Sequence, residues 1–299
     1  MTIKNHSKLC LMVSAAIMVV ALVMSLCGWG VNMGIDFSGG LAMQYNMGGT
    51  FAESDVSTVL KNMGVGDFTV TTQGADKDEV TVRIKSVGED DVQAVQADFE
   101  QQLKAAYPNL SQAGDVNYVG PVAGAALLRN CFVSVLLASA LMLVYIAFRF
   151  DLNSGVAAVC GLLHDVLMML SFMVILRNFV QMNSSFIAAM LTIVGYSINN
   201  TIVIFDRIRE NARKAPAAAK EDVVNTSVRE CLGRTINTTL TTLITIVALF
   251  VLGVASIREF ALPIIIGILS GTYSANMING YIWAYLEEKK LFTRKAKKA

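Results

Sequence analysis

The sequence has few of the side chains on which soluble domains and active sites depend. Charged residues make up only 16% of its 299 residues, against roughly 25% in an average soluble domain, and there are just 2 histidines and 4 prolines. Lys and Arg (24) nearly balance Asp and Glu (23), so the net charge is +1. This balance excludes a strongly basic nucleic-acid-binding protein and an acidic disordered chain.

Cysteine is also scarce, and its positions fit neither a disulfide framework nor a zinc site. We interpret the five cysteines as small buried apolar residues. No G-x-x-x-x-G-K-[ST] loop, zinc-protease motif or dinucleotide-binding loop is present. The sequence therefore predicts a protein that is not an enzyme, with no catalytic residue, no metal and no cofactor. The cysteines are Cys10, Cys27, Cys131, Cys160 and Cys231.

Long apolar runs are what the sequence does have, since 54% of its residues are hydrophobic. A membrane-spanning helix needs about 20 predominantly apolar residues, and six stretches meet that requirement. The first is longer than the apolar part of a signal peptide, so we expect an uncleaved anchor. The predicted spans are Leu9–Gly28, Ala125–Phe148, Gly155–Leu176, Phe186–Phe205, Ile236–Val254 and Ala261–Trp283.

The charges of the connecting segments predict how the spans are oriented. Residues 30–121 hold 5 Lys/Arg and 13 Asp/Glu, whereas residues 207–234 hold 7 and 4, and the tail after Leu286 holds 6 and 2. Cytoplasmic loops carry the excess of Lys and Arg. We therefore expect a multi-pass membrane protein with both termini in the cytoplasm.

This layout divides the chain into four parts. A cytoplasmic N-terminus and the first span occupy residues 1–29, and an extracytoplasmic domain occupies residues 30–121. A five-helix membrane bundle with the cytoplasmic loop 207–234 follows over residues 122–286. A basic cytoplasmic tail, residues 287–299, ends the chain.

The extracytoplasmic segment has the pattern of a small α+β domain. Its order of elements, β-α-β-β-α-β, is that of the ferredoxin-like fold. Because this segment has no His, no Cys and no nucleophile–base pair, we expect no catalytic role for it. Strands are predicted over residues 41–46, 67–72, 79–85 and 115–119, with a hairpin loop at 74–78, and helices over residues 53–63 and 90–107.

Polar side chains inside the spans are the main candidates for function, because a charge at membrane depth costs at least about 2.5–3.5 kcal/mol. His164 and Asp165 lie near the middle of the third span. A carboxyl group there suits a proton carrier, and it equally suits a structural hydrogen-bonded pair that holds helices together. The sequence leaves both interpretations open.

The fourth span carries two amides and ends in charged residues. Asn199 and Asn200 cannot titrate near neutral pH, and amides in lipid typically cross-link helices. Asp206 and Arg207 follow at the end of the span, in the manner of a solvated helix end. In the sixth span, the small-xxx-small pair Gly267 and Gly271 favours close helix packing.

The fifth span begins with a cation followed by a stripe of hydroxyls. Offsets of 4, 7, 8 and 11 residues place four threonines on the same helix face as Arg234. Such a stripe is typical of a wet path, although Arg234 can also extend to the membrane surface and the hydroxyls can bond their own backbone. The threonines are Thr238, Thr241, Thr242 and Thr245.

Several motifs together resemble the SecF family, the smaller membrane subunits of the bacterial SecD–SecF protein-export complex. The match extends in order over nearly the whole chain. It implies a polytopic α-helical protein of the bacterial cell membrane, with six transmembrane helices forming half of an RND-type transporter. A ferredoxin-like domain lies outside, and SecD supplies the other half. The motifs are Gly34–Gly40 (GIDFSGG), Tyr145–Asp151 (YIAFRFD), His164–Val166 (HDV), Gly195–Asn211 (GYSINNTIVIFDRIREN) and Ser227–Thr242 (SVRECLGRTINTTLTT).

The resemblance also implies a function and partners. Such a subunit helps SecD complete translocation of unfolded polypeptide through the SecYEG channel, with a proton or sodium gradient as the energy source and possible contact with an insertase. By the resemblance, Arg234 matches an arginine of the family's ion pathway and His164-Asp165 matches its third-span pair. Gly34, Asp36, Gly39 and Gly40, with Pro121, mark the junctions of the outer domain and are candidate hinges.

One departure from the family pattern separates the hypotheses. The fourth-span motif of the family usually ends in Asp, whereas here that position is Asn200, which cannot carry a proton. Either a carboxylate of SecD suffices, or Asp165 substitutes, or this chain is uncoupled or uses another ion. The alternatives to an ion-coupled subunit are a non-transporting scaffold of the translocon and half of an RND-type small-molecule exporter.

Overall fold

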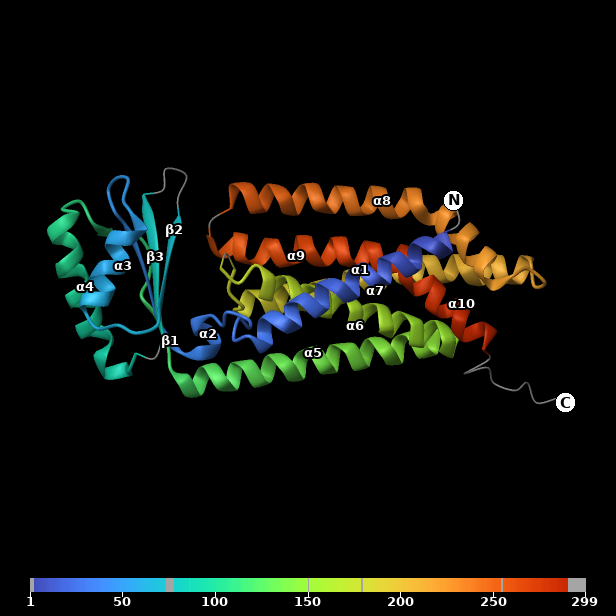
Figure 1. The fold of residues 1–299 in the computed structure, drawn as a ribbon, viewed down its shortest axis with the longest axis horizontal. Helices are drawn as coiled ribbons and strands as arrows, with labels where there is room; N and C mark the ends of the chain where they lie inside the picture. The colour runs from blue at the N-terminus through green and yellow to red at the C-terminus, as the bar shows by residue number, and fades with distance from the viewer. Residues whose placement is uncertain are drawn as a thin grey trace.

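The computed structural model describes residues 3–73, 78–85, 87–149, 151–178, 180–253 and 255–289. The molecule is elongated, with a small α/β domain at one end and a bundle of long helices forming the rest (Figure 1). We call residues 40–119 the folded domain and the opposite end of the bundle the far end. The far end contains the start of the first helix and the turn between α7 and α8.

In the described part of the chain, six helical stretches are long and apolar enough to span a membrane, as predicted. The observed spans differ from the predicted ones only at their ends, most of all at the start of the fifth span, which begins at Lys220 instead of Ile236 because polar turns continue the helix past the apolar stretch. The helices are α1 (Ile3–Leu26), α5 (Pro121–Arg149), α6 (Leu152–Ile175), α7 (Ser184–Lys214), α8 (Lys220–Leu252), and α9 (Ala255–Ser274) continued by the π-helical turn η2 (Ala275–Asn279) and α10 (Gly280–Glu288).

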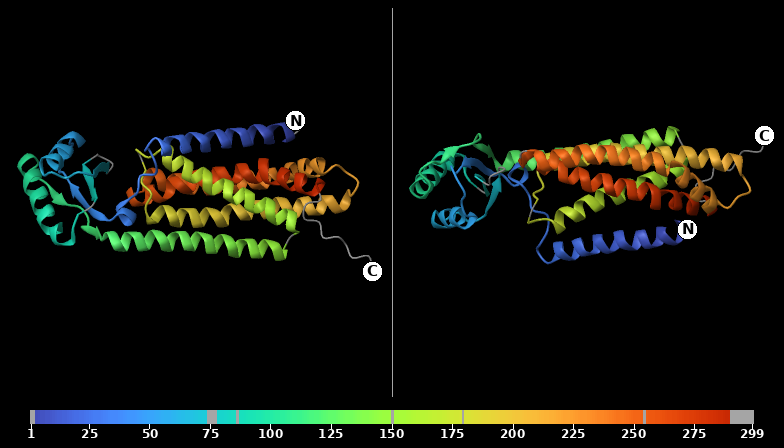
Figure 2. Two further views of the ribbon diagram at one scale, coloured as in Figure 1. Left: turned by 60° about the horizontal axis from the view of Figure 1, so that its bottom comes forward. Right: turned by 90° about the horizontal axis from the view of Figure 1, so that it is seen from above.

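The six spans form an inner and an outer set. In α6, α7 and the α9–α10 span, 56–61% of the most apolar window is buried, against 0–11% in α1, α5 and α8. Figure 2 shows α1 and α5 along the sides of the bundle. The outer helices therefore present apolar side chains to lipid or to another subunit.

Local sequence explains where the inner helices begin. Asp151 caps α6, since its carboxylate accepts hydrogen bonds from the backbone N–H and the hydroxyl of Ser154. Asn183 caps α7 in the same way, and its side-chain oxygen accepts from the backbone N–H of Phe186 at 3.0 Å. These caps fix the entry points of the two helices that contribute most to the site described below.

The folded domain confirms the predicted β-α-β-β-α-β order. Its antiparallel sheet has the order β2-β3-β1-β4, with β5 also paired to β1. The short strand β4 and the turn η1 (Glu89–Asp91) were not predicted, and α4 starts after that turn. The elements are β1 (Gly40–Asn46), α3 (Glu53–Asn62), β2 (Phe68–Gln73), β3 (Glu79–Lys85), α4 (Val92–Ala106), β4 (Ser111–Gln112) and β5 (Asn117–Val119).

One face of the sheet packs on α3 and α4 to form the core of the folded domain (Figure 1). Alternate residues of β1, namely Leu41, Met43 and Tyr45, are fully buried there with Phe99 of α4. Burial of a large apolar side chain contributes roughly 1.5–3 kcal/mol, so this small domain has a real core of its own.

Three expectations need correction. Residues 207–234 are not a loop, because α7 and α8 continue through them and only residues 215–219 connect the two helices. Among the cysteines, Cys131 and Cys231 are buried as expected, whereas Cys27 and Cys160 are exposed on the surface of the bundle. Glu287 and Glu288 of the predicted tail belong to α10, and residues 290–299 lie outside the described residues.

The GIDFSGG segment joins α1 to the folded domain through the short helix α2 (Ile35–Ser38). Gly39 and Gly40 have φ values of 75° and 142°, which favour glycine. A Cβ atom on Gly39 would lie 2.9 Å from the Cα atom of Pro121, and one on Gly40 would lie 2.2 Å from the carbonyl oxygen of Ile84. The two connections to the domain are therefore packed tightly together; a hinge here stays a prediction.

Candidate functional site

The centre of the helix bundle contains a fully buried carboxylate. Asp165 of α6 has 0% exposed surface and lies where α6, α7 and α9 meet. Its neighbour on the same helix, His164, places Nδ1 3.0 Å from Asp165 Oδ1. The structure thus brings together the two residues that the sequence singled out in the third span.

Serine hydroxyls from two other helices complete the surroundings of this carboxylate. Ser197 of α7 donates to Asp165 Oδ2 at 2.5 Å, and Ser274 of α9 donates to the same atom at 2.9 Å. Ser270 of α9 donates to Oδ1 at 2.9 Å. Asp165 therefore connects α6, α7 and α9 through hydrogen bonds. Among the described residues, no Lys or Arg side chain forms an ion pair with it.

Close helix packing makes this arrangement possible. Gly271 of α9 lies between Ser270 and Ser274 in sequence, and a Cβ atom there would lie 3.1 Å from Cβ of Ser197 and 3.4 Å from Asp165 Oδ2. One turn earlier, a Cβ on Gly267 would lie 2.5 Å from the side chain of Ile193. The sequence predicted close packing for the small-xxx-small pair, and the structure shows that the partner helix is α7.

The partners of Asp165 suit a group that changes its protonation state. A serine hydroxyl has one donor and two acceptor positions and rotates freely. The three serines can therefore donate to the ionised carboxylate or accept from the protonated acid without any change of backbone. His164 extends the network, because its Nε2 lies 2.8 Å from the hydroxyl of Ser14 on α1.

The two asparagines of the fourth span occupy different environments. Asn200 is buried, with 5% of its surface exposed, and its Nδ2 atom has no partner among the described residues. Asn199 is exposed on the neighbouring face of α7. Neither is a hydrogen-bond partner of Asp165 among the described residues.

Arg234 and the predicted hydroxyl stripe face away from the buried centre. Arg234 and Thr238 are exposed, and Thr242 is partly exposed. The hydroxyls of Thr238 and Thr242 donate to backbone carbonyls of their own helix at 2.9 Å, which is the alternative that the sequence left open. The threonines of α8 that do enter the bundle are Thr235 and Thr239, and Thr239 bonds Thr272 of α9 at 2.9 Å.

Asp206 and Arg207 lie beside Arg234 at the edge of a cavity of about 310 Å³ between α7 and α8. Asp206 pairs with Arg149 of α5 at 3.6 Å. Arg207 bonds Glu230 and Glu210, each at 2.6 Å. These residues tie helix ends together near the far end, and Arg234 has no carboxylate partner within the part of the chain that the structure describes.

The folded domain is joined to the bundle by polar contacts. Asp36 of α2 accepts hydrogen bonds from the backbone N–H and the hydroxyl of Ser184, at the start of α7. Arg83 of β3 pairs with Glu259 of α9 at 2.7 Å, and Glu259 also accepts a hydrogen bond from Asn183 at 2.6 Å. The helices α7 and α9 that supply the serines therefore also hold the domain.

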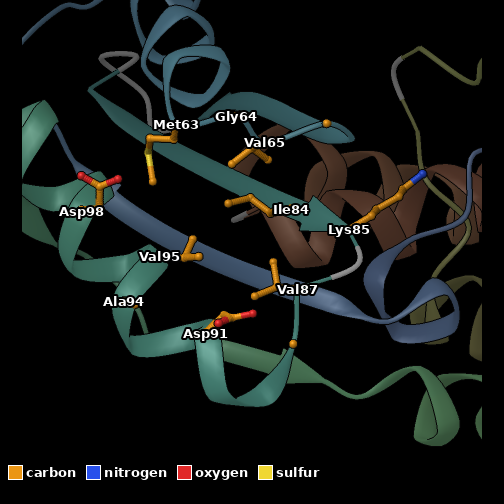
Figure 3. A pocket seen from close by; sticks show the side chains of 12 residues that line it. Met63, Gly64, Val65, Ile84, Lys85, Val87, Asp91, Ala94, Val95 and Asp98 are labelled. Atoms are coloured by element: carbon orange, nitrogen blue, oxygen red, sulfur yellow. The ribbon is translucent and has the colours of Figure 1, made fainter.

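The folded domain has a groove of about 480 Å³ on the side away from the bundle core, between the end of α3, β3 and α4 (Figure 3). Apolar side chains such as Val65, Ile84 and Val95 line it, with Asp91 and Asp98 on the α4 side. The described residues of the lining include no Cys, His or Ser.

Comparison with known proteins places this architecture in a family. Residues 98–289 match the family described as protein export membrane protein SecD/SecF, C-terminal. The chain is 35% identical over 259 residues to protein translocase subunit SecF of Rickettsia bellii, covering 87% of this chain and 84% of that protein. The chain belongs to the SecF family. It is also 36% identical over 275 residues to the SecF of Alicyclobacillus acidocaldarius, covering 88% and 86% of the two chains.

Solved structures extend the SecF likeness to the whole fold. The chain matches SecDF, a translocon-associated membrane protein from Thermus thermophilus, with a TM-score of 0.79 and 32% identity over 95% of this chain. It also matches SecDF in a super-membrane-facing form, with a TM-score of 0.67 and 30% identity over 97% of this chain. This SecF-family chain spans only 38% of the length of either SecDF chain.

Sequence reasoning missed the serine partners in this SecF-family chain. Ser270 and Ser274 lie four residues apart in an apolar span, which is a readable signal for one polar helix face. Ser14 gave no signal, because a single small hydroxyl among apolar residues of the first span is unremarkable. Among the described residues, no group of three His, Cys, Asp or Glu side chains could hold a metal ion.

Proposed function

We propose that this chain is a protein-export accessory subunit that works with SecD in the bacterial cell membrane and uses an ion gradient to move its folded domain. Membership of the SecF family supports the export role, since the relatives are named protein translocase subunits. The SecDF structures support SecD as the partner. A non-catalytic role fits both.

The proposed orientation places the folded domain outside the cell and the far end in the cytoplasm. The support is the excess of Lys and Arg in residues 207–234 against the excess of Asp and Glu in residues 30–121. In this orientation the folded domain meets polypeptide that leaves the SecYEG channel, with an insertase as a further neighbour. The exposed apolar faces of α5 and α8 are available to SecD or lipid.

The observation that carries the coupling proposal is the buried network around Asp165. Burying a carboxylate with 0% exposure inside a membrane bundle costs free energy. Its hydroxyl partners can bond both the ionised and the protonated form. One proton that moves across 100 mV releases about 2.3 kcal/mol. That energy biases a two-state equilibrium by roughly fiftyfold, which suffices to favour one position of the domain.

The experiment is an export assay with vesicles that contain the complete translocon and this chain with its SecD partner. We expect Asp165→Asn to remove most of the stimulation that an imposed proton gradient gives, because an amide cannot exchange a proton. Asp222→Asn, an exposed carboxylate at the start of α8, is the control and should retain the stimulation. Equal stimulation in the wild type and Asp165→Asn, with intact complex, would contradict coupling through this residue.

A scaffold without ion coupling is the second candidate, and Asn200 is the observation that favours it. This amide stands where the resemblance implies an aspartate, and it is buried in the bundle. A scaffold predicts that the gradient has no effect on export in any variant while loss of the chain still disrupts the complex. The same vesicles therefore distinguish the two candidates.

A further inference from the structure

The sixth span changes its register in the middle of the bundle. The turn Ala275–Asn279 is π-helical, so residues on either side of it that share a face are five apart instead of four. Such turns occur frequently at functional sites. Across this turn, one face of the span carries a polar atom at every position, and its residues are Ser270, Ser274, Asn279, Trp283 and Glu287.

A matching face of α6 lies against these residues. Asp165 contacts Ser270 and Ser274, and at the other end Asn153 donates to Glu287 at 2.5 Å. The α6 residues of this face follow at intervals of four, and they are Asn153, Ala157, Gly161 and Asp165. We call the two facing rows the polar seam. It runs from the buried carboxylate to the far end of the bundle.

Small residues of α6 make room for the polar side chains of the sixth span. A Cβ atom on Gly161 would lie 2.2 Å from Oδ1 and 2.4 Å from Nδ2 of Asn279, so the amide lies directly on the glycine backbone. Ala157 is fully buried in the same core cluster as Trp283. Without the π-helical turn, Ile278 and not Asn279 would follow Ser274 on this face.

The polar seam holds buried polar atoms without a protein partner. Within the described residues these are Asn279 Oδ1, Trp283 Nε1 and Asn153 Oδ1, and the three side chains are 1%, 6% and 3% exposed. Buried polar groups are nearly always hydrogen-bonded, to protein or to ordered water. Two acceptors and a donor along these two facing rows therefore fit bound water molecules.

We propose that the polar seam is the route by which water and protons reach Asp165 from the far end of the bundle, with Asn279 at its narrowest point and Glu287 at its mouth. Titratable side chains stand at both ends, His164 and Asp165 at one and Glu287 at the other. Between them lie only neutral groups, which pass a proton only with the help of water. This inference deepens the proposed function and rests on it.

The test is deuterium exchange at His164, whose Nδ1 contacts Asp165. The chain contains only His6 and His164, so His6→Gln with isotopically labelled histidine in this chain alone leaves the ring of His164 as the one labelled histidine ring in solid-state NMR. The complex with its SecD partner, in lipid vesicles, is transferred to D2O and the exchange of the ring N–H is followed. Asn279→Leu keeps the size of the side chain and removes its polar atoms, so we expect exchange to slow at least tenfold.

Asn276→Leu is the matched control, because Asn276 lies on the same π-helical turn, is equally buried, and bonds the carbonyl of Thr272 away from the polar seam. It should exchange at the wild-type rate. Gly161→Ala is the second variant, since its new methyl group displaces the Asn279 amide, and it should also slow exchange. Wild-type exchange in Asn279→Leu or Gly161→Ala, or equal slowing in Asn276→Leu, would overturn the proposal.

The deuterium-exchange measurement does not depend on export activity, so it tests the polar seam separately from the proposed function. If exchange slows as expected while export ignores the gradient, the polar seam stands and the proposed coupling fails. If Asp165→Asn removes gradient stimulation while exchange is unaffected by Asn279→Leu, coupling stands and the polar seam is not the route.

Discussion

Asp165 and Asn200 show how much a single side chain decides in a membrane bundle. Both are buried, but Asp165 has four polar neighbours from three helices, whereas Asn200 keeps an unpartnered Nδ2 among the described residues. A carboxylate in such a place must have partners, because an isolated buried charge is far more costly than a buried amide. This difference in partners is why the proposed ion coupling is assigned to Asp165 and not to Asn200.

Residue-scale electrostatics in the folded domain gives a prediction about pH. Hydrogen bonds from Gln96 and Tyr45 hold the pKa of Glu100 below its ordinary value, and burial raises the pKa of Tyr45. The stabilisation from ionised Glu100 is present above pH 4.5 and is lost as the pH falls through its lower folded-state value. The stabilisation from neutral Tyr45 is present below pH 10 and is lost as the pH rises through the raised folded-state pKa of this residue.

We therefore expect the domain of the intact chain to lose stability below about pH 4.5, and Glu100→Gln to reduce that acid sensitivity. The infrared amide band of β-sheet reports this, because all the described sheet lies in the folded domain. Asp98→Asn, on the same helix, is the control. An acid transition that is identical in wild type and Glu100→Gln would show that other carboxylates determine it.

At the scale of elements, the sixth span is the least regular helix of the bundle. Pro263 lies inside α9, where it cannot donate the backbone hydrogen bond to Glu259, and the π-helical turn follows twelve residues later. Glu259 forms the ion pair with the folded domain, and Ser270 and Ser274 bond Asp165. The helix is therefore irregular on both sides of the two serines, at Pro263 and at the π-helical turn. We infer that this span moves in segments when the Asp165 network rearranges.

The closely packed start of β1 gives a prediction at this scale. Gly40 begins β1 with φ 142°, and a Cβ atom there would overlap the carbonyl oxygen of Ile84 at 2.2 Å. Gly40→Ala should therefore destabilise the folded domain by at least about 1–3 kcal/mol from backbone strain alone. Gly49→Ala is the control, because no atom lies within 4 Å of its Cβ position.

The β-sheet infrared band during thermal unfolding measures both variants. A large fall in the midpoint for Gly40→Ala with little change for Gly49→Ala is expected. An unchanged midpoint in Gly40→Ala would mean that β1 and β3 separate easily at this end of the sheet and that the glycine is not required there.

Elements of this fold were largely readable in the sequence, and contacts between them were not. Apolar length predicted the spans, and alternation predicted the strand Glu79–Lys85 at its observed bounds. The 207–234 segment was misread because charged helix turns that leave the membrane look like a loop. Short β4 has too few residues to show any alternation.

The candidate site was predictable only in part. His164 and Asp165 were visible because charges are rare in spans, and their burial follows from the structure. The serines became partners only through the packing of α9 on α7, which no local pattern in α6 records. Arg234 and Thr238 were expected to face a wet path, and the structure places them on an exposed face of α8.

For the whole molecule, the contact between Arg83 and Glu259 is the strongest polar link between the folded domain and the bundle. Its 2.7 Å bond is mostly shielded, with side chains 17% and 19% exposed, and Asn183 shares the carboxylate. Gln181 adds a weaker bond to Thr69 of β2 at 3.2 Å. The orientation of the domain therefore depends on a few removable contacts.

Arg83→Gln should broaden the distribution of distances between spin labels on α4 and α5, because it removes the charged half of this link. Lys85→Gln, two residues along the same strand and without a described ion pair, should leave the distribution narrow. Pulsed electron-spin measurements on the complex in lipid provide the comparison. Equal distributions in all three proteins would mean that the connecting segments alone set the domain orientation.

The central claim is that protons pass through this chain at Asp165, and proton flux tests it most directly. Vesicles containing the purified complex with SecD, an internal pH dye and an imposed voltage report that flux. The account predicts a voltage-driven flux in the wild type that falls to the background of empty vesicles in Asp165→Asn and persists in Asp222→Asn. An equal flux in wild type and Asp165→Asn would contradict it.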